Sequence, residues 1–201
     1  DHHLAALANR PSSAARDTAV VCGGGFTGIE VATEMPSRLR AILGPKANVR
    51  VIIVDRNEAI APAMGPNPRP LIEKALREAG VETRLGVGVS ALTGSGVTLS
   101  DGQSIESATV IWAGGFRASP LTSQVPTERD RSDRLVVDSN LRVAAVPTIF
   151  GAGDTAQAAT DDLGHPALMS CQHANRLGAS AGFNAAADLL VLPSDHGETW
   201  G

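Results

Sequence analysis

The stretch AVVCGGGFTGIEV, residues 19–31, decides the fold of this chain. It opens with a short apolar run of β-branched character, which is typical of a strand buried on both faces. Gly23, Gly25 and Gly28 follow with the spacing G-x-G-x-x-G, and an apolar helical pattern begins at Ile29. The first glycine permits a tight turn, the second lets the backbone approach a pyrophosphate, and the third lets the helix pack on the strand. The stretch therefore predicts a cradle for a dinucleotide.

The next predicted strand, NVRVIIVD, ends in the carboxylate of Asp55, 55 − 28 = 27 positions after the last glycine. A spacing of about 20 is usual, and we expect Pro36 to end or kink the helix near Met35. This interruption, together with a turn at Gly44-Pro45, would absorb the excess. A carboxylate at this place accepts hydrogen bonds from a ribose and repels a 2′-phosphate, so NADH is favoured over NADPH. Arg56 keeps NADPH open as an alternative, and a solvated acid at a strand end is the structural alternative for Asp55.

Composition narrows the class of protein. The chain has 201 residues, 43% of them hydrophobic, with 17 basic and 21 acidic side chains and a net charge of −4. This balance indicates a globular protein with no nucleic-acid partner, because a phosphate-binding groove needs a basic surplus. No apolar run approaches the roughly 20 residues of a membrane-spanning helix, and we expect no signal peptide. The histidines and both cysteines are scattered without ligand spacing, so we expect no metal site and a cytoplasmic location.

The order of predicted elements indicates an α/β fold. Residues 1–18 are expected to form a helical tail and linker, and residues 19–116 an NAD(H)-binding domain. This domain is expected to be Rossmann-like, with an antiparallel β-meander inserted within residues 81–112, where Gly94-Ser95-Gly96 and Asp101-Gly102 predict hairpin turns. Further strands are expected in RLVVDSNLRV and PTIFGAGD, and a long Ala-rich helix near the C-terminal end.

Four motifs in order carry a family resemblance: VVCGGGFTGIEVATE, ATVIWAGGFRASPL, PTIFGAGD and MSCQHANRLGASAGFNAAADLL. From about Thr18 to Leu192 the chain resembles the later part of flavoproteins with two dinucleotide-binding domains, the pyridine nucleotide-disulfide oxidoreductase-like superfamily. Within it, the resemblance is closest to type II NADH:quinone oxidoreductases and related FAD-dependent NADH dehydrogenases. It implies that residues 117–201 are an incomplete C-terminal portion of an FAD-binding domain.

The resemblance implies roles for residues around the glycine loop. Glu30 is expected near the nicotinamide end of NADH, where it would take part in catalysis; an ordinary acid near a helix start is the alternative. The remaining NADH-binding residues are expected in the loop itself, after the second strand, and in the turn that closes the domain: Gly23, Gly25, Phe26, Thr27, Gly28, Asp55, Arg56, Ala113, Gly114 and Gly115.

For FAD, the resemblance implies a second group of residues. Asp154 is expected to hydrogen-bond the ribityl and phosphate region, with Gly153 allowing close backbone approach; a helix N-cap is the alternative for Asp154. Gln172 is expected on the quinone side of the flavin as a catalytic residue, and His173 and Ala174 are expected to offer backbone groups. Solvated helix positions are the alternative for Gln172 and His173.

The implied cofactors are NAD(H) and FAD, with hydride passing from NADH to FAD and electrons then passing to a quinone or another small acceptor. Family members carry an earlier glycine loop for FAD, which is lacking before residue 19, so we expect this chain to bind NADH and to retain FAD poorly. The alternatives left open are a non-catalytic NAD(H)-sensing module and a reductase of the ferredoxin or nitrite type. A homodimer and a peripheral position on the inner membrane face also stay open for the full-length form.

Overall fold

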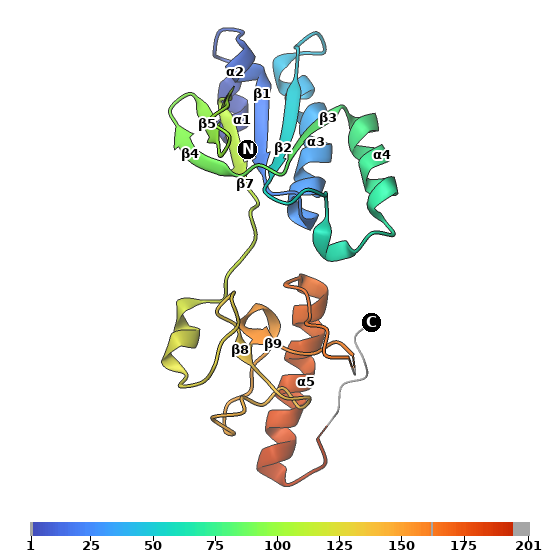
Figure 1. The fold of residues 1–201 in the computed structure, drawn as a ribbon, viewed down its shortest axis with the longest axis vertical. Helices are drawn as coiled ribbons and strands as arrows, with labels where there is room; N and C mark the ends of the chain where they lie inside the picture. Colours follow the sequence, from blue (N-terminus) through green and yellow to red (C-terminus); the bar gives the residue numbers. More distant parts are fainter. Residues whose placement is uncertain (1, 162, 195–201) are drawn as a thin grey trace. The chain divides into compact units, whose positions relative to one another are not determined.

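The computed structural model describes residues 2–161 and 163–194, which divide into two compact units, Asp1–Gly115 and Phe116–Gly201. The first unit is built on a four-stranded parallel sheet (Figure 1). Its strands lie in the order β3-β2-β1-β7. Their bounds are Thr18–Cys22 for β1, Arg50–Asp55 for β2, Val81–Leu85 for β3 and Thr109–Trp112 for β7.

Helices cover one face of this sheet. They are α1 (His2–Leu7), α3 (Phe26–Leu43) and α4 (Arg69–Ala79), and the short α2 (Ala14–Asp17) leads into β1. Leu7, Met35 and Leu39 are buried together with Leu76 against every second side chain of β1 and β2. The segment expected as a tail thus contributes Leu7 to the core of this unit.

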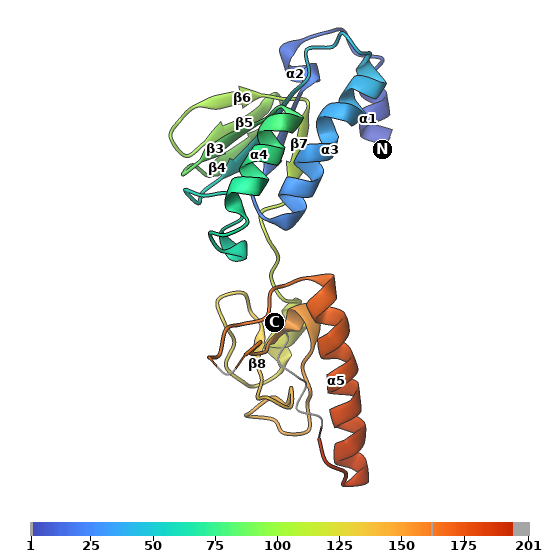
Figure 2. The ribbon, with the colours of Figure 1, turned by 90° about the vertical axis from the view of Figure 1, so that its right-hand side faces the viewer.

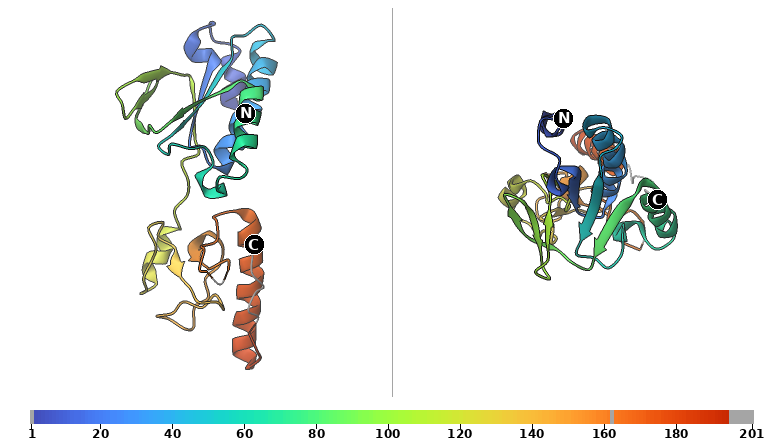
Figure 3. Two further views of the ribbon diagram at one scale, coloured as in Figure 1. Left: turned by 45° about the vertical axis from the view of Figure 1, so that its right-hand side comes forward. Right: turned by 90° about the horizontal axis from the view of Figure 1, so that it is seen from above.

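The predicted meander covers the other face (Figures 2 and 3). It consists of β4 (Val89–Thr93), β5 (Gly96–Leu99) and β6 (Ser104–Glu106), which pair antiparallel. Its buried Val97 and Leu99 pack on the alternate side chains of the central strands, Val20 and Ile52 among them. Because both faces are covered, β1 is buried along its whole length, which explains its unbroken apolar sequence. The expected α/β fold with a Rossmann-like unit is confirmed.

The expectation that Pro36 ends the helix near Met35 is wrong, because α3 continues through Pro36 to Leu43. A proline inside a helix removes one backbone hydrogen bond and costs about 3 kcal/mol. Here Met35, Pro36 and Leu39 are all buried, so packing of this helix face offsets that cost. The long spacing between Gly28 and Asp55 is taken up by this helix of 18 residues and by the expected turn, which begins at Gly44.

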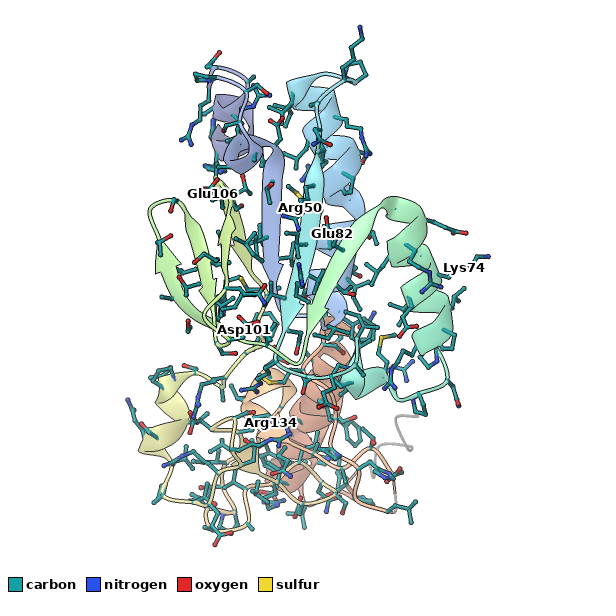
Figure 4. The ribbon with its side chains drawn as sticks, turned by 45° about the horizontal axis from the view of Figure 1, so that its top comes forward. Arg50, Lys74, Glu82, Asp101, Glu106 and Arg134 are labelled. Carbon is teal, nitrogen blue, oxygen red and sulfur yellow. The ribbon has the colours of Figure 1, made fainter. Side chains whose placement is uncertain are left out.

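An ion pair joins two strands at the amino ends of the sheet, far along the strands from the glycine loop. Arg50 of β2 and Glu82 of β3 point toward one another (Figure 4), with Nε–Oε1 and Nη2–Oε2 distances of 2.7 and 2.8 Å. The Arg50 hydrogen bond holds the pKa of Glu82 below its usual value. Both side chains are close to half exposed, so the pair contributes at most about 1 kcal/mol.

The second unit contains one long helix, α5 (Cys171–Leu190), and little regular sheet. Its other elements are the 3₁₀ turns η2 (Pro120–Gln124) and η3 (Gly153–Thr155) and the two-residue strands β8 (Leu135–Val136) and β9 (Ala156–Gln157); the remaining 3₁₀ turn, η1 (Pro62–Met64), lies in the first unit. The strands expected in RLVVDSNLRV and PTIFGAGD are thus reduced to β8 and isolated bridges such as Arg142↔Phe150. The backbone bonds locally instead: Asp138 Oδ1 accepts from the N–H groups of Asn140 and Arg142.

A partly buried ion pair anchors the loop before α5. Arg134 donates through Nε to Asp130 Oδ2 at 2.8 Å and through Nη1 to the carbonyl oxygen of Ala167 at 2.8 Å. Burial raises the pKa of Asp130, but hydrogen bonds from Arg134 and from the N–H of Ser132 outweigh it, so the pKa is lowered overall. The ionised carboxylate therefore stabilises this unit.

Candidate functional site

The glycine loop lies at the point where the strand order of the sheet reverses. β1 is flanked by β2 on one side and by β7 on the other, and Cys22 at its carboxyl end is in register with Val54 and Trp112. Open parallel sheets bind their ligands at this switch point, outside the carboxyl ends of the strands. The fold therefore brings the loop, the end of β2 and the turn after β7 to one edge.

The three glycines of the motif differ in what surrounds them. Gly23 has φ +120°, and a Cβ built there would lie 2.2 Å from the carbonyl oxygen of Ala113. A Cβ on Gly28 would lie 1.8 Å from the carbonyl oxygen of Gly23, so the start of α3 rests directly on the loop. A Cβ on Gly25, in contrast, would meet no atom within 4 Å. The first and third glycines serve the fold, and the second faces open space that a phosphate can occupy.

The first turn of α3 has groups that suit an anion. Gly25 is its N-cap and supplies no side-chain hydrogen bond, and the first turn contains no acidic residue. Backbone N–H groups at such a helix start bind phosphates. Phe26 is half exposed and Thr27 is exposed beside them. Glu30 is also exposed and lies beyond the first turn, so it is not a first-turn acid.

The Asp55 side chain is hydrogen-bonded to the glycine loop, so it is more than a solvated acid at the end of a strand. Its Oδ2 accepts a hydrogen bond from the Gly24 N–H at 2.5 Å. Its Oδ1 accepts from the backbone N–H and from Nδ2 of Asn57, both at 2.7 Å. Arg56 is exposed next to it. Residue patterns alone did not indicate Asn57; an amide two positions after a strand-ending acid is the signal that was available.

The turn after β7 forms the other wall of the loop. The Ala113 N–H donates to the Cys22 carbonyl oxygen at 2.8 Å, and the Ala113 carbonyl occupies the space beside Gly23. Gly115 has φ +95° and lies where the first unit ends. The expected residues Ala113, Gly114 and Gly115 therefore follow β7 next to the glycine loop, and Trp112 at the end of β7 is exposed.

In the second unit the structure brings two of the predicted FAD segments together. Gly153 has φ +61°, and a Cβ built there would lie 3.4 Å from the Ala174 Cβ of α5. Asp154 is exposed within η3, whose N-cap is Ala152, so Asp154 itself is not the cap. A flavin phosphate or ribityl chain fits such a site, because a tight glycine turn and an exposed carboxylate meet the start of a helix.

The start of α5 is fixed by Ser170. The Ser170 Oγ accepts from the His173 N–H at 3.4 Å and lies 2.7 Å from His173 Nδ1. This leaves Gln172 exposed, and its Oε1 lies 3.6 Å from the Cys171 Sγ. His173 is therefore engaged in capping its own helix, whereas Gln172 is open to a ligand.

A groove of about 800 Å³ lies elsewhere in the first unit, between the N-terminal segment and the β4–β5 hairpin. Its lining includes Arg10, Arg16, Ser95 and Ala108, and it contains none of the expected site residues. Ala108 directly precedes β7, so the groove is at the amino edge of the sheet, opposite to the glycine loop.

Comparison with known proteins agrees with this geometry. The family described as pyridine nucleotide-disulphide oxidoreductase matches residues 3–178. A NADH dehydrogenase-like protein of Mycobacterium tuberculosis is 49% identical over 193 residues, covering 95% of this chain and 48% of that protein. A type II NADH:quinone oxidoreductase of the same organism is 34% identical over 154 residues, covering 69% of this chain and 33% of its own length. This chain thus spans about half or less of the relatives it matches.

Among solved structures, a FAD-dependent pyridine nucleotide-disulphide oxidoreductase from Desulfovibrio vulgaris has a TM-score of 0.65 at 25% identity, covering 85% of this chain and 42% of that one. A ferredoxin reductase from Rhodopseudomonas palustris, at 22% identity and a TM-score of 0.66, covers 91% of this chain and 43% of its own and shares the fold. Within the described residues, no helix is long and apolar enough to cross a membrane. Matched over residues 3–178, the chain belongs to the pyridine nucleotide-disulphide oxidoreductase family.

Proposed function

We propose that this chain supplies the NADH-binding unit, and part of the FAD-binding unit, of a flavin-dependent NADH dehydrogenase whose electron acceptor is a quinone. The observation that carries the proposal is the contrast among the glycines: Gly23 and Gly28 are closed by backbone atoms, whereas the Gly25 position is open at an uncapped helix start. The names of the relatives support the same activity.

The positions of four groups of expected NADH residues suit different parts of the nucleotide. The N–H groups that follow Gly25 bind the pyrophosphate, and Asp55 accepts a hydrogen bond from the adenosine ribose. The turn at Ala113–Gly115 confines the nicotinamide half on the other side of the loop. Glu30, exposed beyond the first turn of α3, orients the nicotinamide end of the nucleotide.

In the second unit, Gly153 and Asp154 would hold the phosphate and ribityl region of FAD, and His173 and Ala174 would offer backbone groups to the flavin. When bound, FAD accepts hydride from NADH and returns electrons singly or in pairs. Gln172, exposed at the start of α5, would contact the quinone. No side chain of the chain has to act as a nucleophile in this scheme.

The test uses the full-length protein that contains this chain, loaded with FAD. We expect NADH to bleach the flavin absorbance under anaerobic conditions and a water-soluble quinone to restore it. Gln172→Ala should slow the second step and leave the first unchanged, with Asn175→Ala, exposed on the same helix, as the control. Bound flavin that NADH does not reduce would contradict the proposal, and reduction without reoxidation by quinone would contradict the acceptor.

A further inference from the structure

Residues 55–61, which begin with the last residue of β2, hold Gly24 in the middle of the glycine loop from both sides. The Gly24 N–H donates to Asp55 Oδ2 at 2.5 Å, and the Gly24 carbonyl oxygen accepts from the Ala61 N–H at 2.8 Å. Ile60 is fully buried, and its Cδ1 is the nearest atom to a Cβ built on Gly24, at 2.7 Å. Gly24 is thus fixed through its donor, its acceptor and its packing by residues 55–61.

The Asp55 carboxylate is already largely occupied before any nucleotide arrives. A carboxylate offers about four acceptor positions, two on each oxygen. Asn57 fills both on Oδ1 with its backbone N–H and its Nδ2, and Gly24 fills one on Oδ2. One position on Oδ2 is left for a ribose hydroxyl, so most of the hydrogen bonding of this carboxylate serves the protein.

We propose that Asp55, oriented by Asn57, is a positioning residue for the pyrophosphate loop in addition to its contact with the ribose. It joins Gly24 to the end of β2 and so sets the position of the adjacent Gly25 and of the N–H groups that follow it. Because NADH and NADPH share the same pyrophosphate, loss of the carboxylate weakens both. A residue that acted on the ribose alone would instead admit NADPH once its negative charge was removed. This inference rests on the proposed binding of NADH.

The first test is made without nucleotide. Amide hydrogen exchange at Gly24 and Gly25 is followed by NMR in wild type, Asp55→Ala and Glu58→Ala. Glu58 is an exposed acid of the same segment whose side chain does not bond the loop, so it is the matched control. We expect exchange of the Gly24 amide to rise at least tenfold in Asp55→Ala and to stay within twofold of wild type in Glu58→Ala. Equal exchange in Asp55→Ala and wild type would overturn the proposal.

The second test measures Kd for NADH and for NADPH by fluorescence titration. We expect Asp55→Ala to weaken NADH at least tenfold and to bind NADPH no more tightly than wild type does. A tenfold gain in NADPH affinity would show a role on the ribose alone and would overturn the proposal. If wild type binds neither nucleotide, the proposed function fails, whereas the exchange result still decides the role of Asp55 in the loop.

Asn57→Ala keeps the carboxylate and supplies an independent variant if Asp55→Ala does not fold. It removes one of the two donors to Oδ1, so we expect faster exchange of the Gly24 amide, by about threefold, and a similar loss of NADH affinity. Asn67→Ala, exposed in the same unit, is its control. The same exchange rate in Asn57→Ala and Asn67→Ala would remove Asn57 from the proposal.

Discussion

Replacing Gly25 with valine should abolish NADH binding and leave the fold intact. Gly25 has φ −82° and ψ −171°, which any residue adopts, and its Cβ position has no neighbour within 4 Å. Replacing a glycine of this conformation gains about 0.4–1 kcal/mol from the unfolded chain. Loss of glycine at the N-cap costs a similar amount, so the free energy of unfolding should change by less than about 1 kcal/mol. The new side chain fills the space of the pyrophosphate, and we expect Kd for NADH to rise at least a hundredfold.

Gly23→Ala is the informative comparison, because this substitution should destabilise the fold, whereas Gly25→Val should leave it intact. Its φ of +120° strains an L-residue, and the added Cβ would lie 2.2 Å from a backbone oxygen that cannot turn away. We expect a loss of about 3 kcal/mol or more, which lowers Tm by roughly 10 °C or more in a unit of this size. Thermal unfolding by circular dichroism and NADH titration are run on both variants. Unchanged NADH affinity in Gly25→Val, or equal stability of Gly23→Ala and wild type, would refute the reasoning.

Three further predictions concern other parts of the chain. Burial raises the pKa of the Cys22 thiol to about 11, so at pH 8 a thiol reagent should modify exposed Cys171 quickly and Cys22 only after unfolding; two equivalents in the native protein would contradict this. Asp130→Asn should cost about 2 kcal/mol at pH 7 in urea unfolding. Because the folded pKa of Asp130 is lowered, this stability is fully present above its unfolded pKa of about 4 and is lost as pH falls through the folded value, so the difference in stability between wild type and variant should shrink steadily as the pH is lowered below about 4. Ser170→Ala removes the cap of α5 and should cost about 1 kcal/mol, which urea unfolding also measures; an unchanged midpoint would show that the cap contributes nothing.

Local patterns were sufficient for the parts of the first unit that are buried on both faces. The β1 and β2 sequences are continuous apolar runs because a helix layer and the meander each take alternate side chains. The hairpin turns at Gly94-Ser95 and Asp101-Gly102 connect the meander strands as predicted. The strand, glycine loop and helix that open the unit follow the same local rules.

Pro36 shows where a local rule gives way to packing. The sequence contains the helix breaker but not the contact that overrides it, which is burial of the Met35–Leu39 face against the sheet. The prediction of strands in the second unit fails for a different reason. The apolar segments of this unit resemble strands, but Asp138 and neighbouring backbone groups close short turns, so that the two-residue strand β8 and isolated bridges are what remains of them.

The candidate site was predicted at the level of residues but not of their connections. Asp55 was expected to meet a ribose, whereas its bond to Gly24 joins positions 31 residues apart and leaves no local trace in the sequence. Ile60, which packs on Gly24, was missed for the same reason, whereas Asn57 bonds Asp55 from only two positions away. Spacing identifies the groups that face a ligand, and only the folded chain shows which of them also hold one another.

The pairing of β1 with β7 has a consequence for synthesis on the ribosome. Ala19 pairs with Thr109, which follows it by 109 − 19 = 90 positions, and the wall beside Gly23 belongs to Ala113. A nascent chain that has already exposed its glycine loop therefore lacks one side of the cradle until the residues after Trp112 have left the exit tunnel. Closing so long a loop is slow compared with forming a helix or hairpin. If the chain binds NADH as proposed, the nucleotide can therefore bind only when this unit has been completed, and it would stabilise the finished unit but not its earlier folding intermediates.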